Sequence, residues 1–348
     1  MTIPFTQIDT LFINGAKVAP EAGTEAVINP ATEAVIGQAP VASLTQVDAA
    51  IAAARDAFDN GPWPQMTLDQ RGDILDRMVA ALKARQADIA ALIVAEVGCA
   101  QGITQIMQVA NPINHLAATI RHGRRDDSER LPLDITPNMF APDGPQNVGG
   151  TTVVREPFGV VSAITGYNFP FLLNLAKIGP ALMAGCTMIL KPSQFTPYSA
   201  LLFGEICNEI GLPKGVLNIV TGGIAEGQLL CTDERVDMVT FTGSESVGAA
   251  IMAQAAPTLK KVHLELGGKS AMIVRHDADV QRAYDYKGKT PKAVEGGGGT
   301  RFDPALAWVS NPSNGTFDAC IYLTDGYAGE PEVRPRCPML WVITADGN

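Results

Sequence analysis

Short apolar runs alternate with longer stretches of helical spacing from residue 159 to residue 256, and this alternation constrains the fold more than any other feature of the sequence. Four runs have the length and composition of buried strands, at 159–164, 187–192, 216–222 and 238–243. Three stretches have the spacing of helices, at 170–184, 196–210 and 244–256. Such alternation predicts an α/β fold with a mostly parallel sheet that helices cover on both faces. Ligands of such sheets bind beyond the carboxyl ends of the strands.

The residues before this region predict a β-hairpin, two helices and a connection. The Asn14-Gly15 pair lies between short apolar runs, which is the strongest short-range signal of a hairpin. Capping-box patterns at Ser43 and Thr67 each predict the start of a helix, and the second helix is expected to extend to Gly98. A polar segment rich in Pro and Gly, at about 124–150, predicts a connection outside the core.

The composition excludes several classes of protein. With 348 residues the chain has room for about two domains. Its net charge of −10 and the lack of a Lys/Arg cluster argue against a nucleic-acid partner and against binding to an anionic membrane. The six cysteines form no CxxC pair and the four histidines form no HExxH motif, so neither a metal site nor a disulfide framework is expected. The first residues have no leader pattern and no long apolar run follows them, so a cytoplasmic location is expected.

Three of the predicted strands end in polar residues that a buried sheet would otherwise avoid. Asn168 follows the first strand, where its amide could stabilise a developing oxyanion or cap the next helix. Lys191 ends the second strand, where it could bind a ribose or a phosphate or lie in solvent. Gly243, Ser244 and Gly248 follow the fourth strand and open a helix. A helix N-terminus there could bind pyrophosphate, although a plain strand-to-helix turn has the same pattern.

A further candidate is Glu265, which lies between two leucines and is followed by two glycines. Its carboxylate could be a partly buried general base. The alternative is a strand residue that faces solvent, which is the more common situation of a glutamate.

Together these features resemble the aldehyde dehydrogenase superfamily, because they occur in that family's order and with comparable spacings. The resemblance covers about residues 8–282. It includes flanking segments that read NPATE at 29–33, REPFG at 155–159, KIGPAL at 177–182 and GLPKGVLN at 211–218. It implies a Rossmann-type parallel sheet with N-terminal helices and a β-hairpin. It also implies a small aldehyde as substrate and NAD or NADP as cofactor.

The resemblance implies a role for each candidate residue. Asn168 would share the oxyanion hole, and Glu265 would be the general base. Lys191 would contact the adenosine ribose, and Ser244 the pyrophosphate. The other cofactor contacts would be Thr165, Ser193, Gln194, Gly222, Gly227, Phe241, Thr242, Gly243, Gly248, Leu266 and Gly267. The family most often has Glu where Gln194 stands, and since Gln repels a 2′-phosphate less, both NAD and NADP stay open.

The sequence departs from the family where the nucleophilic cysteine is expected. In the family that cysteine follows the general base by about 35 residues, which here falls in the EGGGGT segment at 295–300. The next cysteine, Cys320, lies in an apolar run, where a core position is the more common situation. The family's later segments have no counterpart either. The resemblance therefore predicts a truncated NAD(P)-dependent oxidoreductase that is impaired or inactive, and the alternative is a silent dinucleotide-binding remnant.

The tail differs from the family and resembles the end of a von Willebrand A-like domain that follows metallopeptidase-like modules in bacteria. A helix at about 304–309 and strands at 319–323 and 339–344 make it a short α/β segment. In such domains Thr and Asp at strand ends bind a divalent metal, which would be Thr300 and Asp325 here. The companion Asp-x-Ser-x-Ser motif has no counterpart in the sequence, so no bound metal is expected.

The two resemblances predict a fusion of two domains, with an aldehyde dehydrogenase-like region at 1–282 and a von Willebrand A-like fragment at 283–348. A third functional alternative is thus an interaction module built on the tail. The aldehyde dehydrogenase family forms dimers and tetramers through a C-terminal strand that has no counterpart here. The family's homo-oligomer is therefore not expected.

Overall fold

The computed structural model describes residues 8–125, 128–140 and 143–267, and the backbone of three further strands at 271–275, 317–324 and 339–343. The chain divides into two compact units. Unit 1 comprises Met1–Phe241 and Ile251–His263. Unit 2 comprises Thr242–Ala250 and Leu264–Asn348, and each unit is described by itself.

A seven-stranded sheet forms the centre of the fold, with the strand order β13-β12-β9-β10-β11-β1-β2. Its parallel strands are β9 (Val160–Ile164), β10 (Thr187–Lys191), β11 (Leu217–Ile219) and β12 (Met238–Gly243). The helices that follow them are α6 (Pro170–Ala184), α7 (Tyr198–Glu209), α8 (Ile224–Thr232) and α9 (Glu245–Ala255), and β13 (Lys261–Leu266) lies at one edge of the sheet. The predicted alternation and the parallel sheet are confirmed, whereas α8 was not predicted.

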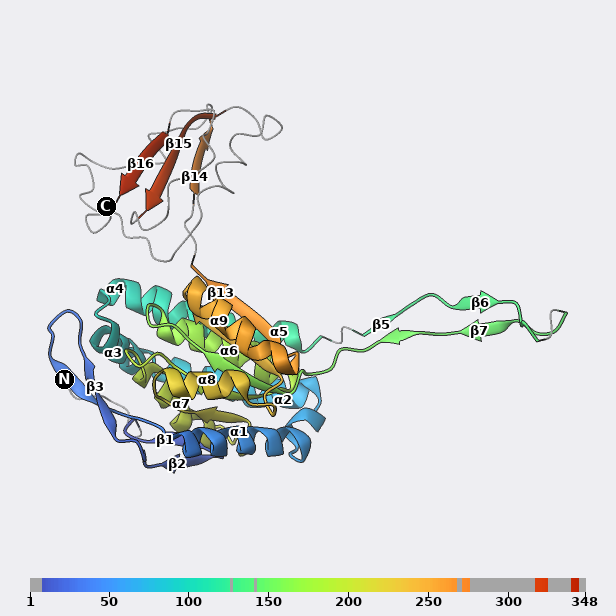
Figure 1. Ribbon diagram of the computed structural model, residues 1–348, viewed down its shortest axis with the longest axis horizontal. Coiled ribbons are helices and arrows are strands. Elements are labelled where there is room, and N and C mark those ends of the chain that lie inside the picture. The colour runs from blue at the N-terminus through green and yellow to red at the C-terminus, as the bar shows by residue number, and fades with distance from the viewer. Residues whose placement is uncertain are drawn as a thin grey trace. The chain divides into compact units, whose positions relative to one another are not determined.

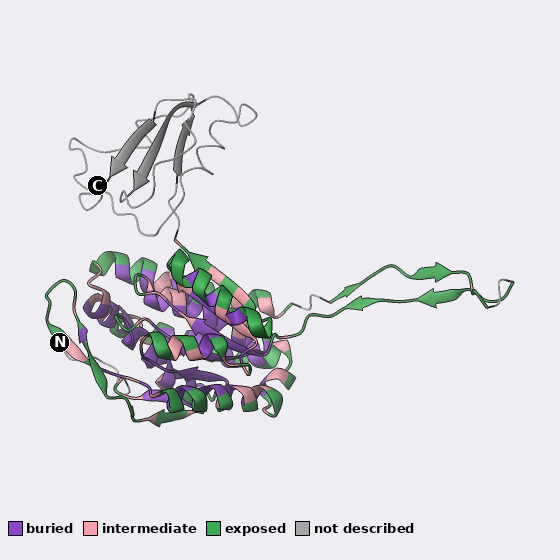
Figure 2. Ribbon diagram, in the orientation of Figure 1, coloured by how far each residue is buried: buried purple, intermediate pink, exposed green. Residues whose placement is uncertain are grey.

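Helices cover both faces of this sheet (Figure 1). On one face α1 (Leu44–Asp59) contacts β9, β10 and α8, and the Thr187 hydroxyl of β10 donates to the Ala54 carbonyl of α1 at 2.8 Å. On the other face α6 contacts β10 and α7, and the rings of Phe171 and Phe203 stack with centroids 5.7 Å apart. The parallel strands and the inner faces of these helices are mostly buried, whereas the edge strands β2 and β13 are largely exposed (Figure 2).

The N-terminal hairpin has the predicted turn. Strands β1 (Leu11–Ile13) and β2 (Ala16–Val18) pair antiparallel, and β1 extends the central sheet through the pairing of Phe12 with Ile219. Asn14 and Gly15 both have positive φ, at 51° and 74°, which is the backbone of a type I′ turn. A second hairpin, β3 (Thr24–Ile28) with β4 (Val35–Pro40), was not predicted.

Both capping boxes are present, but the helix predicted from Thr67 to Gly98 is wrong, because the structure has two helices there. They are α2 (Leu68–Ala84) and α3 (Gln86–Val97), and they separate at Arg85, where φ is −109° and ψ is 15°. Beyond the break α3 contacts α7, whereas α2 contacts both α5 (Asn111–Gly123) and α7. At the break the Arg85 guanidinium pairs with Glu209 of α7. Gly98 ends α3 in the left-handed conformation, as predicted.

Short elements connect these parts of unit 1. They are a 3-10 turn at Trp63–Gln65, α4 (Gln101–Ile103) and a π-helix at Thr104–Ala110. The predicted connection after residue 124 lies outside the core, which confirms that prediction, but it contains two strand ladders that were not predicted. These pair β5 (Glu129–Arg130) with β8 (Thr152–Val153) and β6 (Asp134–Thr136) with β7 (Asn147–Gly149), and all four strands are exposed.

In unit 2, a three-stranded sheet has the order β14-β15-β16. Strand β14 (Ala271–Arg275) pairs antiparallel with β15 (Phe317–Thr324), which pairs parallel with β16 (Met339–Ile343). The predicted strands at 319–323 and 339–344 are thus confirmed. The predicted helix at 304–309 and the candidates Thr300 and Asp325 lie outside the described residues.

The start of β9 is held by a carboxylate from the end of the loop before β12. Asp237 Oδ2 accepts the backbone N–H of Val160 at 2.7 Å and the guanidinium of Arg55 at 2.8 Å. The neighbouring Gly159 has a φ of 124°, and a Cβ built on it would lie 1.9 Å from the same oxygen. A glycine is therefore required at this position for the carboxylate to reach both donors.

The start of α7 is held by a buried carboxylate. Glu96 of α3 is only 2% exposed and accepts the backbone N–H groups of Tyr198 and Ser199, the latter at 3.1 Å. These groups belong to the first turn of α7, which has no partner for them within the helix. Burial raises the pKa of Glu96 to about 8, although the backbone donors oppose the shift.

The folded protein thus binds the Glu96 proton more tightly than the unfolded chain does. We expect the free energy of unfolding to fall as the pH rises from about 4.5 through about 8, because the unfolded carboxyl loses its proton first. Glu96→Gln keeps an acceptor for α7 and does not titrate, so its unfolding free energy should lack this component of the slope. Urea unfolding at several pH values measures it, with Glu234→Gln on the surface as the control. Parallel pH profiles of wild type and Glu96→Gln would contradict the expectation.

Candidate functional site

The carboxyl ends of β9, β10 and β11 meet at one edge of the sheet in unit 1. The pairing of Lys191 with Ile164 aligns the ends of β9 and β10, and the pairing of Leu190 with Ile219 aligns β10 with β11. The loops that follow these strands carry most of the predicted residues of unit 1. They are Thr165 and Asn168 after β9, Ser193 and Gln194 after β10, and Gly222 after β11.

Lys191 is the buried charge of this edge. Its side chain is 6% exposed, and among the described residues it has neither an ion pair nor a hydrogen bond. It extends past α8, where a Cβ built on Gly227 would lie 3.8 Å from Lys191 Cε. Burial lowers the pKa of Lys191, and the negative charges of Glu226 and Glu25 partly offset that effect.

A carboxylate of α8 organises the turn opposite Lys191. Glu226 Oε2 accepts the backbone N–H of Gly223 at 2.7 Å. The preceding Gly222 has a φ of 148°, and a Cβ on it would lie 2.7 Å from Glu226 Cγ. A Cβ on Gly223 would lie 3.8 Å from Gln194 Oε1, so the turn also reaches the loop after β10.

The structure therefore brings together four predicted residues, which are Lys191, Gln194, Gly222 and Gly227. Glu226 was missed by the sequence analysis. A glycine followed three residues later by a glutamate before an apolar run is a helix-start pattern, and it could have indicated this residue.

The residues after β9 differ in burial. Thr165 is 3% exposed, donates its hydroxyl to Asn174 Oδ1 at 2.8 Å and donates its backbone N–H to the Lys191 carbonyl at 3.1 Å. Asn168 is exposed and accepts the N–H of Phe169 at 3.1 Å. The N-cap of α6 is Phe169, and no side chain caps this helix, so the interpretation of Asn168 as a helix cap is wrong.

Two aromatic residues that the sequence analysis missed flank these loops. Tyr167 after β9 and Phe195 after β10 have ring centroids 6.0 Å apart in an edge-to-face arrangement. Both are largely exposed, at 60% and 63%. Ser193 lies just before Phe195, and its hydroxyl accepts the Phe195 N–H at 3.3 Å, which places it within the turn.

The remaining candidates lie on β12, α9 and β13. Phe241 closes the unit 1 part of β12 and is buried, at 6% exposed. In unit 2 the hydroxyl oxygen of Thr242 is buried, and within the described ranges it has no hydrogen-bond partner. Ser244 is exposed, and its Oγ accepts the Val247 N–H at 3.4 Å at the start of α9. Gly243 is half-buried between them.

Gly248 of α9 and Leu266 of β13 lie in contact within unit 2, since a Cβ on Gly248 would lie 2.7 Å from Leu266 Cδ2. Gly267 is half-buried beside Leu266. Glu265 is exposed on β13, so partial burial of this carboxylate is not found. Within the described ranges, no group of three His, Cys, Asp or Glu side chains could hold a metal ion. No helix of the described part is long and apolar enough to cross a membrane.

Comparison with known proteins identifies the family. The aldehyde dehydrogenase family model matches residues 17–289, and the model of a VWA-like domain (DUF2201) matches residues 238–348. The chain is 40% identical over 281 residues to 3-succinoylsemialdehyde-pyridine dehydrogenase from a Pseudomonas species, which covers 80% of this chain and 55% of that protein. It is 38% identical over 286 residues to betaine aldehyde dehydrogenase 1 from Oryza sativa subsp. japonica, with 79% and 54% covered.

Solved structures agree with this match. Betaine aldehyde dehydrogenase from Staphylococcus aureus, solved in complex with NAD+, superposes with a TM-score of 0.73 at 31% identity and covers 81% of this chain and 54% of that one. An NAD-dependent aldehyde dehydrogenase from Sinorhizobium meliloti gives a TM-score of 0.72 at 36% identity, with 79% and 53% covered. The chain belongs to the aldehyde dehydrogenase family, and it spans about half the length of the relatives it matches. Its C-terminal third also matches the VWA-like domain.

Burial of a lysine without an ion pair lowers the free energy of unfolding, so replacement of Lys191 tests whether its buried charge destabilises the fold. We expect Lys191→Met to raise the free energy of unfolding by about 1 kcal/mol, because it removes a buried charge that has no ion pair among the described residues. The control is Lys177→Met, because Lys177 is also buried but donates to Thr240 Oγ1 at 2.8 Å, and its loss should destabilise. Thermal unfolding without added ligand measures both variants. Equal destabilisation by the two substitutions would show that Lys191 is structural.

Proposed function

We propose that the chain binds NAD+ or NADP+ at the carboxyl edge of its parallel sheet and that it oxidises aldehydes poorly or not at all. The binding half of this proposal rests on Lys191, a buried cation that no carboxylate pairs within the described residues. Family membership and the NAD+ complex of the Staphylococcus aureus relative support the same choice of cofactor.

The residues of unit 1 fit the adenosine part of a dinucleotide. The Lys191 ammonium and the exposed Gln194 amide supply hydrogen-bond donors for ribose hydroxyls. Gly227 and Gly223 leave room next to these groups, since a Cβ on either would meet its neighbours only at 3.8 Å. Gln194 carries no negative charge that would repel a 2′-phosphate, so NAD and NADP both remain candidates.

For the residues of unit 2 the support is the family motif and their place in the chain. Ser244 lies at the start of α9, where its Oγ accepts the Val247 N–H, and the N-terminus of a helix favours a pyrophosphate through its dipole and backbone N–H groups. Gly248 allows α9 to lie close to Leu266. We propose these residues, with Thr165, Ser193, Gly222, Phe241, Thr242, Gly243 and Gly267, as further cofactor contacts.

The proposed chemistry is that of an aldehyde oxidoreductase. NAD(P)+ would supply a hydride acceptor when bound. The exposed Asn168 amide can donate a hydrogen bond to a carbonyl oxygen that gains negative charge, and the exposed Glu265 carboxylate can accept a proton from water. In this chemistry both roles depend on a nucleophile that first attacks the aldehyde carbon.

We propose that this chain lacks such a nucleophile. The sequence contains no cysteine between Glu265 and Cys320. Three of the cysteines in the described part are buried, and burial raises their thiol pKa values, to about 11 for Cys231 and upward for Cys186 and Cys207. A raised thiol pKa leaves little thiolate at neutral pH, so these groups are poor substitutes for the family nucleophile.

We also propose that the aldehyde dehydrogenase part gives way to the VWA-like part near residue 282. This boundary falls within residues 238–289, which both family models match. A cytoplasmic location and the absence of the family's oligomer stay predictions.

Titration with the two dinucleotides tests the binding half. We expect NAD+ or NADP+ to raise the thermal midpoint of the full chain, because a ligand that binds only the folded state stabilises it. Lys191→Met should lose most of this shift, whereas Lys214→Met, an exposed lysine on another loop, should keep it. The binding proposal would be overturned if neither dinucleotide shifted the midpoint.

Reduction of the dinucleotide tests the catalytic half. After addition of short and aromatic aldehydes to the NAD+- or NADP+-saturated protein, we expect little or no NAD(P)H absorbance. The reason is that loss of a covalent nucleophile lowers turnover by on the order of 10⁶ in serine proteases. Turnover at ordinary enzyme rates, roughly 1 to 10³ per second, would show that the chain retains a working nucleophile.

A further inference from the structure

A cavity of unit 1 lies at the amino ends of the parallel strands, whereas the residues described above lie at their carboxyl ends. It has a volume of about 1200 Å³ and is lined by the ends of α1, α5 and α6, by the start of α2 and by residues 154–157, which lead into β9. Helix α6 begins after β9 and ends just before β10, so its last residues lie at the amino ends of the strands. No residue that we propose for the dinucleotide site lines this cavity.

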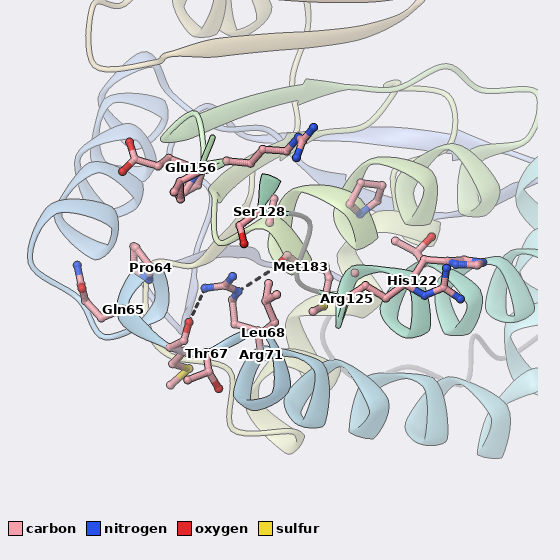
Figure 3. Close-up of a pocket in the computed structure, with 18 of the residues that line it drawn as sticks. Pro64, Gln65, Thr67, Leu68, Arg71, His122, Arg125, Ser128, Glu156 and Met183 are labelled. Atoms are coloured by element: carbon pink, nitrogen blue, oxygen red, sulfur yellow. Dashed lines mark hydrogen bonds between the residues drawn. The ribbon is translucent and has the colours of Figure 1, made fainter. Parts of the chain in front are cut away.

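A buried guanidinium lies at the centre of the cavity lining (Figure 3). Arg71 is 6% exposed and donates to two backbone carbonyls, from Nε to Met183 at 3.0 Å and from Nη1 to Met66 at 2.6 Å. An arginine has five N–H groups, so three of them remain for another acceptor. Arg71 has no ion pair with a carboxylate of the described residues, and burial lowers its pKa.

The rest of the lining adds charged side chains of both signs and apolar surface. His122 lies in the last turn of α5 and Arg125 just after the helix, and Figure 3 shows them side by side at one end of the group, with Ser128 between them and Glu156. Among the acidic lining residues, Asp59 already binds Arg55 at 2.9 Å. The apolar part of the lining comprises Phe58, Met66, Leu68, Val154, Pro180 and Met183.

We propose that this cavity binds an organic carboxylate with a short apolar chain. A guanidinium fork matches the two oxygens of a carboxylate, and an anion there would compensate the buried charge of Arg71. The volume exceeds what a simple inorganic ion fills, and the apolar lining suits a hydrocarbon chain. An inorganic anion would pair with Arg71 but would leave the apolar lining in contact with water.

Calorimetric titration of the full chain with hexanoate tests this site, with hexanamide as the uncharged control ligand and inorganic phosphate as the control anion. We expect saturable binding of hexanoate that is at least about fivefold tighter than that of either control, because only hexanoate combines charge and chain. Binding of phosphate as tight as that of hexanoate, or no saturable hexanoate binding, would overturn the proposal.

Variants locate the site and separate it from the dinucleotide site. Arg125→Gln should weaken hexanoate binding at least about threefold, whereas Arg121→Gln, in the last turn of α5 and outside the lining, should not change it. Ala184→Trp should reduce the binding further, because Ala184 is an exposed lining residue whose replacement fills the cavity without altering the core. Unchanged affinity in both Arg125→Gln and Ala184→Trp would place hexanoate elsewhere and overturn the proposal.

Discussion

The parallel hydrogen bonds that β9 forms with β10 and with β12 are the interaction on which the rest of the structure depends. They align Ile164 with Lys191 and with Phe241, so the loops that carry the polar candidates leave the sheet at the same edge. The amino ends of β9 and β10 are aligned as well, and α6 ends there beside Arg71 together with α5, which packs against α6. One ladder therefore positions both the proposed dinucleotide site and the proposed carboxylate site.

Much of the fold could be predicted because its signals are local. The turn at Asn14 and Gly15, the capping boxes at Ser43 and Thr67 and the apolar runs of the strands each depend on residues that are close in sequence. The break at Arg85 could not be predicted in this way, because an apolar stripe continues across it and the contacts of Arg85, such as its ion pair with Glu209, join residues that are far apart in the chain.

The candidate site follows the same rule. The position of Lys191 at a strand end follows from the strand pattern, but its burial depends on how α8 packs, and neither α8 nor the place of Gly227 on it was predicted. The edge-to-face contact of Tyr167 with Phe195 likewise joins two loops from different strands. Glu265 shows the converse, since its apolar neighbours in sequence suggest burial whereas β13 leaves it exposed. Sequence patterns thus indicate where the candidate residues lie in the chain, whereas their burial and their contacts depend on tertiary packing.

The place of β9 between β10 and β12 also has a consequence for how the protein is made. Asp237, which accepts the N–H of Val160, follows it by 77 residues in the chain. At a synthesis rate of roughly 5–20 residues per second, about 4–15 seconds pass between the emergence of β9 and that of its second neighbour. During that interval β9 is an apolar edge strand whose unpaired N–H and C=O groups can accept a strand from another chain. The nascent chain is therefore most exposed to aggregation while α6 to α8 are being synthesised, and a chaperone that covers β9 would have to act in those seconds.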